Sequence, residues 1–130
     1  MTQIEAVKAY AAAKALNQQT LTGFIAKKIF TLTQKLQPCW DFEMQEEKKI
    51  YEKYPTYDPN KGVCRARDRS EEAIKEASEE AEAVSKDLKE LQELEIEPIN
   101  FEKFTILLEN ENIKISGEEI GSLAPFIDFE

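Results

Sequence analysis

Residues 54–70, YPTYDPNKGVCRARDRS, separate two long charged stretches and decide how the chain is arranged. The segment holds two prolines, one glycine and the Asp58–Pro59 step. Helix-breaking residues at this density stop one helix and turn the chain before the next begins. We therefore interpret residues 55–69 as the loop of an antiparallel helical hairpin.

The stretch after the loop, residues 71–94, predicts an amphipathic helix. Its apolar residues recur at spacings of three and four, as in the seam of a coiled coil, and most intervening positions are charged or polar. Asp68 or Ser70 can cap its start. The predicted seam consists of Ile74, Ala77, Ala81, Val84, Leu88 and Leu91.

The stretch before the loop, residues 21–54, predicts a second and longer helix. Pro38 interrupts it, which predicts either a kink or two abutting helices, because proline removes a hydrogen bond and clashes with the preceding turn. Three phenylalanines lie off the main apolar line, so we expect more than one neighbour. The predicted apolar face consists of Ile25, Ile29, Leu32, Leu36, Trp40 and Met44, followed by Tyr51 and Tyr54.

The two ends of the chain differ in kind. Residues 1–17 predict a short helix, and residues 95–101 and 111–116 alternate weakly in the manner of strands. Ser116 stands three residues before Glu119, a capping-box spacing that starts a helix. The predicted inner side of the N-terminal helix consists of Ile4, Val7, Ala11, Ala15 and Leu16.

Together these patterns predict a mainly α fold in a single domain, residues 1–130. Its centre is a long antiparallel, coiled-coil-like helical hairpin over residues 21–94. A short N-terminal helix over residues 1–17 precedes it. A small C-terminal α/β element over residues 95–130 follows, with strands and a C-terminal helix.

The net charge of −9 is unevenly distributed. Residues 1–40 carry five lysines and one acid, whereas residues 71–100 carry eleven acids and three lysines. The acids form either a solvated helix face or a negative surface directed at a basic partner. The arginines either pair with nearby acids or form a basic tip that touches a phosphate or an acidic partner. The candidate partner-binding residues are Glu79, Glu80, Glu82, Glu90 and Glu93, with Arg65, Arg67 and Arg69.

The composition argues against several chemistries. The chain has no histidine, which removes the commonest general base and metal ligand, and two cysteines alone cannot hold zinc. We therefore expect no enzyme, no catalytic residues, no cofactor and no metal. The basic residues do not dominate a face, so we expect no direct contact with nucleic acid. No apolar run is long enough to cross a membrane, and without a secretory signal we expect a cytoplasmic protein.

Four segments carry a resemblance to a known family. They are IAKKIFTLTQKLQP (25–38), DFEMQEEKKIYEKY (41–54), SKDLKELQELEIE (85–97) and ISGEEIGSLAPFID (115–128). In this order, over about residues 21–129, the chain resembles a family of small tailed-phage proteins of unknown function with a helical hairpin. The resemblance implies a phage or prophage origin and supplies no catalytic residues. The N-terminal helix and the basic loop depart from the family pattern, which leaves their roles open.

Two functional classes fit these observations. The first is a non-enzymatic protein–protein interaction module. In a phage it would be an acidic inhibitor of a host nucleic-acid-binding or defence protein, acting in the host cytoplasm. The alternative is an accessory or structural protein of virion or tail assembly. We also expect a homodimer, because the apolar side chains of the first long helix cover more than one face.

Overall fold

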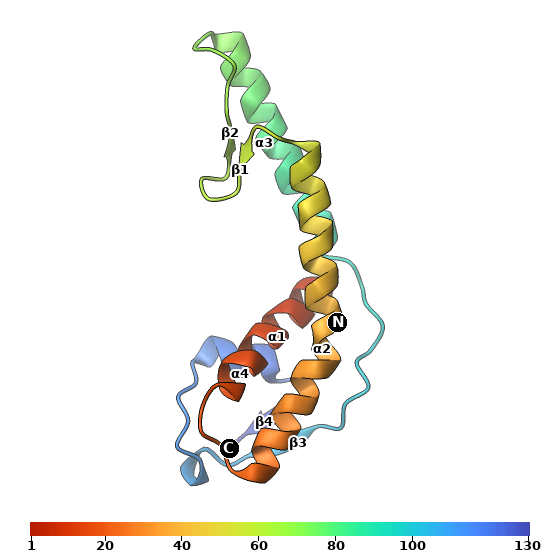
Figure 1. Ribbon diagram of the computed structural model, residues 1–130, viewed down its shortest axis with the longest axis vertical. Helices are drawn as coiled ribbons and strands as arrows, with labels where there is room; N and C mark the ends of the chain where they lie inside the picture. Colours follow the sequence, from red (N-terminus) through yellow and green to blue (C-terminus); the bar gives the residue numbers. More distant parts are fainter.

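The structure, a computed structural model, describes residues 1–130. It is mainly helical, as the sequence predicts. Figure 1 shows a compact part, here called the base (residues 1–43 and 93–130), from which a longer part, here called the arm (residues 44–92), projects. The elements are α1 (Gln3–Asn17), α2 (Gly23–Lys53), β1 (Tyr57–Asp58), β2 (Val63–Cys64), α3 (Glu71–Gln92), β3 (Phe104–Ile106), the 3-10 helix η1 (Leu108–Asn110), α4 (Gly117–Leu123) and β4 (Ile127–Phe129).

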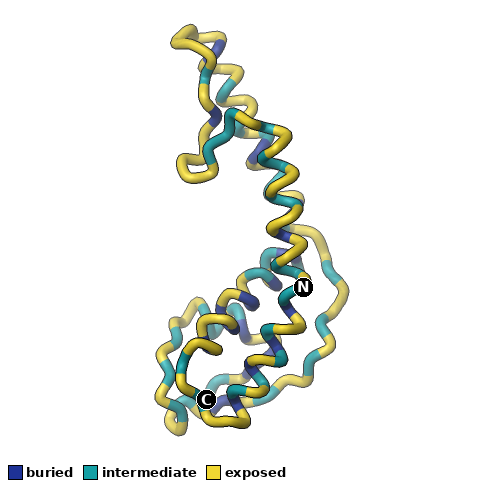
Figure 2. The backbone as a smooth tube through the Cα atoms, in the orientation of Figure 1, coloured by how far each residue is buried: buried dark blue, intermediate teal, exposed yellow.

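The hydrophobic core lies in the base. Figure 2 shows the buried residues concentrated along α1 and the lower part of α2, while exposed residues dominate the arm. Alanines on α1 allow its backbone to approach α2 closely, and isoleucines and leucines of α2 fill the space between them. The core cluster consists of Ala6, Ala9, Tyr10, Ala12, Ala13, Leu16, Ile25, Ile29, Leu32, Leu36, Ile106, Leu123, Phe126 and Ile127.

The predicted N-terminal helix is present, but its predicted inner side is largely wrong. Ala11 and Ala15 are exposed, whereas Ala9, Ala12 and Ala13 are buried. In this alanine-rich helix the side chains differ little in size and polarity, so the pattern gives no contrast between faces. A capping box starts the helix: the Thr2 side chain accepts from the Glu5 amide, and the Glu5 carboxylate accepts from the Thr2 amide.

The predicted apolar face of α2 is right in the base, and in the arm it is wrong at Met44, whereas Tyr51 and Tyr54 are partly buried. Ile25, Ile29, Leu32 and Leu36 are buried as expected. Further along, Met44 is 41% exposed, and the neighbouring Glu43 takes the inner position with 2% exposure. Glu43 continues the three-and-four spacing of the buried side from Leu36, and its carboxylate faces Gln3 of α1, so α1 and not a new neighbour covers this position.

Pro38 does not divide α2, which runs unbroken from Gly23 to Lys53. The expectation of two abutting helices is therefore wrong. Proline leaves the carbonyl of Gln34, four residues earlier, without its helical partner. Both residues are exposed, so water can bond this carbonyl.

The predicted seam of α3 is partly wrong. Val84 and Leu91 are buried, but Ile74 is 54% exposed and Ala73 is buried in its place. The reason is that α2 ends before it reaches the first half of α3. The Tyr54 hydroxyl at the end of α2 donates to Asp87, so the first half of α3 extends past α2 and packs against β1 and β2 instead.

The predicted loop 55–69 contains a short β-hairpin. Tyr57 pairs with Cys64, and Asp58 pairs with Val63, in antiparallel register. Gly62 completes the turn with a φ of 69°, a conformation that glycine adopts without the strain of a side chain. Cys64 is buried and Cys39 is half-buried, and both are free thiols.

The predicted strands over residues 95–101 and 111–116 are wrong. The observed strands are β3 and β4, which pair in parallel with Phe104 opposite Ile127. The alternating isoleucines of the two misassigned segments pack against the core from extended chain, and the only β-bridge of these segments joins Glu95 to Thr2. The C-terminal helix is present as α4, with the predicted capping box between Ser116 and Glu119.

Candidate functional site

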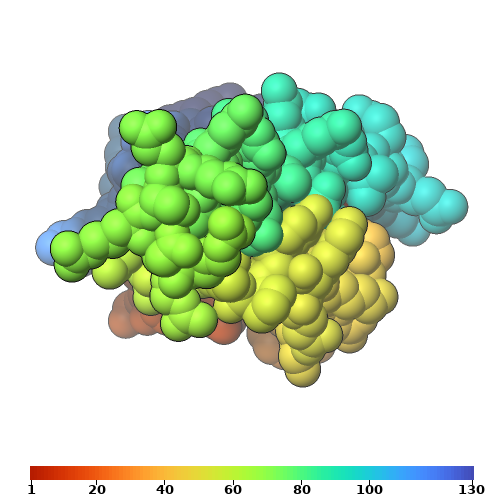
Figure 3. Space-filling model, turned by 90° about the horizontal axis from the view of Figure 1, so that it is seen from above, coloured from red at the N-terminus to blue at the C-terminus, as the bar shows by residue number.

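The arm presents all of the predicted partner-binding residues except Glu93, which follows the last residue of α3. Seen from above in Figure 3, the green residues of the β1–β2 segment and α3 lie in front of the base, with the yellow end of α2 beside them. The Tyr51 and Tyr57 rings stack with their centroids 5.7 Å apart. The Thr56 hydroxyl donates to Glu80 at 3.0 Å. These contacts hold the hairpin of β1 and β2 against both helices.

The five candidate glutamates do not form one equivalent set. Glu79, Glu82 and Glu90 are exposed on α3 and belong to no ion pair. Glu80 accepts a hydrogen bond from Thr56, and Glu93 lies 4.0 Å from the Lys89 ammonium. Two of the five carboxylates therefore take part in contacts within the chain, and three are available to a partner.

The three candidate arginines also separate. The Arg67 guanidinium pairs with Glu76 of α3 and lies 3.6 Å from Asp68, which matches the interpretation that it pairs with nearby acids. Arg65 and Arg69 are exposed and form no ion pair. Arg65 lines an open cavity of about 470 Å³ beside the β-hairpin, together with Tyr57, Val63 and Lys61.

Two exposed apolar residues of the arm were not identified from the sequence as surface residues. Val63 of β2 is 52% exposed and Ile74 of α3 is 54% exposed. The sequence placed Ile74 in the seam, and Val63 has no periodic neighbours that would single it out. Arginine is enriched in protein interfaces, and the buried centre of an interface is more apolar than the rest of a protein surface, so these residues of the arm suit a contact surface.

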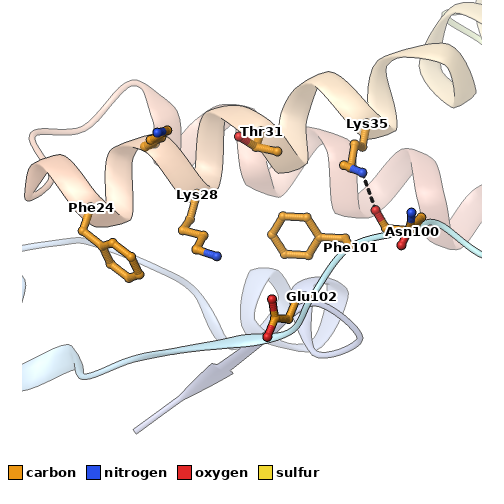
Figure 4. Close-up of a pocket in the computed structure, with 8 residues that line it drawn as sticks. Phe24, Lys28, Thr31, Lys35, Asn100, Phe101 and Glu102 are labelled. Carbon is orange, nitrogen blue, oxygen red and sulfur yellow. Dashed lines mark hydrogen bonds between the residues drawn. The ribbon is translucent and has the colours of Figure 1, made fainter.

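A groove on the base also escaped the sequence analysis. It is a cavity of about 460 Å³ between α2 and the extended segment that leads to β3, and Figure 4 shows Phe24, Lys28 and Phe101 around it. Spacings of four, three and four along α2 put Phe24, Lys28, Thr31 and Lys35 on one side of the helix. That spacing was visible in the sequence, but the opposite wall comes from a distant segment. The full lining is Phe24, Lys27, Lys28, Thr31, Lys35, Asn100, Phe101 and Glu102.

A buried polar contact lies where the base meets the arm. The Gln3 side-chain amide donates to the Glu43 carboxylate at 3.3 Å and to the Cys39 carbonyl at 2.8 Å. Burial raises the pKa of Glu43 above its ordinary value of 4.5, and the bond from Gln3 only partly offsets this. Burial also raises the pKa of Glu47, and the nearby charge of Glu43 adds to the effect.

The chain matches no known protein family, and neither a curated protein nor a solved structure matches it. None of the helices combines the length and the apolar surface that a membrane crossing requires.

Proposed function

We propose that the protein is a non-enzymatic protein–protein interaction module that binds its partner through the arm. One observation carries this proposal. Only Ala73, Val84 and Leu91 are buried among the 22 residues of α3, so the arm presents a long charged helix away from the core. In this proposal α2 and α3 act as an antiparallel, coiled-coil-like hairpin. Support for that pairing comes from the contact of Tyr54 with Asp87 and from the burial of Val84.

The chemistry of α3 favours a basic partner. The carboxylates of Glu79, Glu82 and Glu90 lie on the exposed side of α3, and none of the three forms an ion pair. Lysines interleave with them, so the surface carries a pattern of charges as well as a net negative charge. For a chain of phage origin, we propose an inhibitor of a host nucleic-acid-binding or defence protein. It would act in the host cytoplasm without touching nucleic acid, a cofactor or a metal itself.

The end of the arm favours a second candidate, an accessory or structural role in virion or tail assembly. Permanent assemblies use more apolar interfaces than transient complexes do. Val63 and Ile74 of the arm are each more than half exposed, and Arg65 lines the same cavity as Val63. An assembly partner would cover these apolar side chains, and its affinity would depend weakly on salt.

One experiment separates the two candidates. Affinity capture from host lysate and from phage-infected cells identifies the partner by mass spectrometry, and calorimetry then measures its affinity at low and high salt. Replacing Glu79, Glu82 and Glu90 by glutamine should weaken binding about tenfold at low salt if the acidic side carries the contact. The control replaces Glu109, Glu118 and Glu130, three exposed acids of the base, and should bind like the wild type.

Unchanged affinity in the arm variant would contradict the inhibitor proposal. If affinity is instead lost in a Val63→Ser, Ile74→Ser variant and varies little with salt, the assembly role is supported. Circular dichroism of each variant shows whether the helices persist.

A further inference from the structure

The groove on the base carries a charge opposite to that of the whole chain. Lys27, Lys28 and Lys35 line it, and Glu102 is its one carboxylate. None of the three lysines forms an ion pair, although the chain carries 26 acidic residues. Lys27 and Lys28 therefore remain available to a negatively charged group that comes from outside the chain, whereas the Lys35 ammonium is bound to the Asn100 carbonyl.

The walls of the groove are partly apolar, so a group that binds there must be apolar as well as negatively charged. Phe24 is 67% exposed, and the Lys28 ammonium lies 5.6 Å from the centroid of its ring. The ring of Phe101 faces the groove from the opposite segment in Figure 4. The Lys35 ammonium donates to the Asn100 carbonyl, which fixes that segment against α2. The groove thus suits an apolar side chain that is flanked by carboxylates.

The same chain presents such a segment. Residues 90–97, here called the acidic turn, have the sequence ELQELEIE and contain four glutamates. Leu94 is 46% exposed at its centre. Within the acidic turn, Leu91 is buried, and Leu94 accepts a backbone hydrogen bond from Gln3, so the turn is held firmly on the molecule. Glu90 and Glu97 are exposed and form no ion pair.

The acidic turn and the groove are neighbours. Six residues separate Leu94 from Asn100, so the two sites lie at most about 20 Å apart along the extended chain. Figure 1 shows this segment running beside α2 from the end of α3 toward β3. Two complementary surfaces on one edge of a molecule fit a two-fold dimer, in which each copy supplies one surface and receives the other.

We propose that the groove binds the acidic turn of a second copy of this chain. Leu94 of each copy contacts Phe24 and Phe101 of the other. Glu93 and Glu97 pair with Lys27 and Lys28, whereas Glu95 is held by the N-terminal amine of its own chain at 3.3 Å. This contact goes beyond the proposed function of the arm, because it leaves Glu79, Glu82, Val63 and Ile74 free for another partner and shares only Glu90 with the acidic side of α3.

Sedimentation equilibrium of the full chain tests the proposal. In low salt the average mass should rise with concentration from the chain mass of 14.9 kDa toward twice that value, and added salt should lower it. Lys27→Glu with Lys28→Glu should weaken dimerisation about tenfold or more. The control is Lys8→Glu with Lys48→Glu, which makes the same change in net charge at two exposed lysines and should dimerise like the wild type.

A charge swap makes the test specific. Glu93→Lys with Glu97→Lys should also weaken dimerisation, and combining it with the two lysine reversals should restore a dimer. Leu94→Ser should weaken it as well, whereas Leu107→Ser, at a similarly exposed leucine, should not. A wild-type chain that stays monomeric in low salt would overturn the proposal, and so would a dimer that tolerates the groove reversals. Partner capture by the arm is measured separately with Glu79→Gln and Glu82→Gln alone, which leave the acidic turn intact, so neither result would affect it.

Discussion

At the scale of single residues, Glu43 has the clearest energetic consequence. It occupies a core-facing position of α2 with 2% exposure, and its only side-chain partner is the Gln3 amide. A buried carboxylate that has few hydrogen bonds is destabilised in its charged form. The folded protein therefore bears a cost for this charge that the unfolded chain, in water, does not.

We predict that Glu43→Gln stabilises the protein at neutral pH. The pKa of Glu43 is raised in the folded state, so its protonated form favours folding. That contribution is complete below the unfolded pKa of about 4.5 and is lost as the pH rises through the raised folded pKa. Glutamine retains the shape without the charge, and the gain at pH 7 should be on the order of 1 kcal/mol.

Urea denaturation of the wild type and the variant at a series of pH values checks this. The difference in the free energy of unfolding should be small in acid, grow above pH 4.5 and then level off. Glu79→Gln, an exposed control on α3, should show no such growth. A Glu43→Gln protein that is less stable than the wild type at pH 7 would contradict the argument.

At the scale of elements, α3 shows which features the spacing of apolar residues can predict and which it cannot. The 3–4 spacing correctly predicts an amphipathic helix, and a neighbour covers Val84 and Leu91 as expected. The pattern does not say which element supplies that neighbour. Because β1 and β2 cover the first half of α3, Ala73 faces inward there and Ile74 does not.

The matching prediction compares two truncations on α3. Leu91→Ala should destabilise the protein by about 2–5 kcal/mol, because Leu91 is 6% exposed and its removal leaves a cavity. Ile74→Ala should change the free energy of unfolding by less than about 0.5 kcal/mol, because that side chain is more than half exposed. Chemical denaturation measures both, and equal losses would show that the predicted seam is core after all.

The sequence predicted the long helices well and their partners poorly. Ile25, Ile29 and Leu32 are buried as expected, because one neighbour, α1, covers that part of α2. The failures lie at Met44, because Glu43 faces α1 instead, and at Ile74, because β1 and β2 cover that half of α3. Another failure is the short strand that depends on a distant segment, as in the pairing of Phe104 with Ile127. Periodicity is local information, whereas these features are set by contacts between remote parts of the chain.

Like the fold, the candidate site could be predicted from the sequence only in part. The negative charge of α3 can be counted directly from the sequence, and its glutamates lie on a helix as expected. The groove could not be predicted as a whole, because Lys28 and Phe101 are 73 positions apart and their approach depends on the path of the extended segment. The partnership of Arg67 with Glu76 likewise needed the β-hairpin to be known.

At the scale of the whole molecule, burial is divided unequally. Fourteen of the 20 buried residues form the core cluster of the base. The buried residues of the arm's β-hairpin and α3 are Cys64, Ala73, Val84 and Leu91, and they lie outside that cluster. Because buried apolar contacts hold local structure against opening, the base and the arm should differ in local stability.

Amide hydrogen exchange followed by mass spectrometry should reveal this difference. Peptides from residues 25–36 of α2 should exchange slowly, with protection near that of global unfolding. Peptides from residues 71–80 of α3 should exchange faster, because that half contains one buried residue, Ala73. Binding of a partner to the arm should slow the faster set. Equal protection in the two regions would show that the molecule opens as one unit.

The continuity of α2 has a mechanical consequence. One helix of 31 residues, about 46 Å long at 1.5 Å per residue, crosses from the base into the arm without interruption, and Pro38 lies on its exposed side. The base and the arm are therefore joined by one continuous helix and not by a hinge. A force applied at the end of the arm bends or twists α2. The helix transmits this force to the packing around Leu32 and Leu36. Tension on a bound partner would then be felt first in the core of the base.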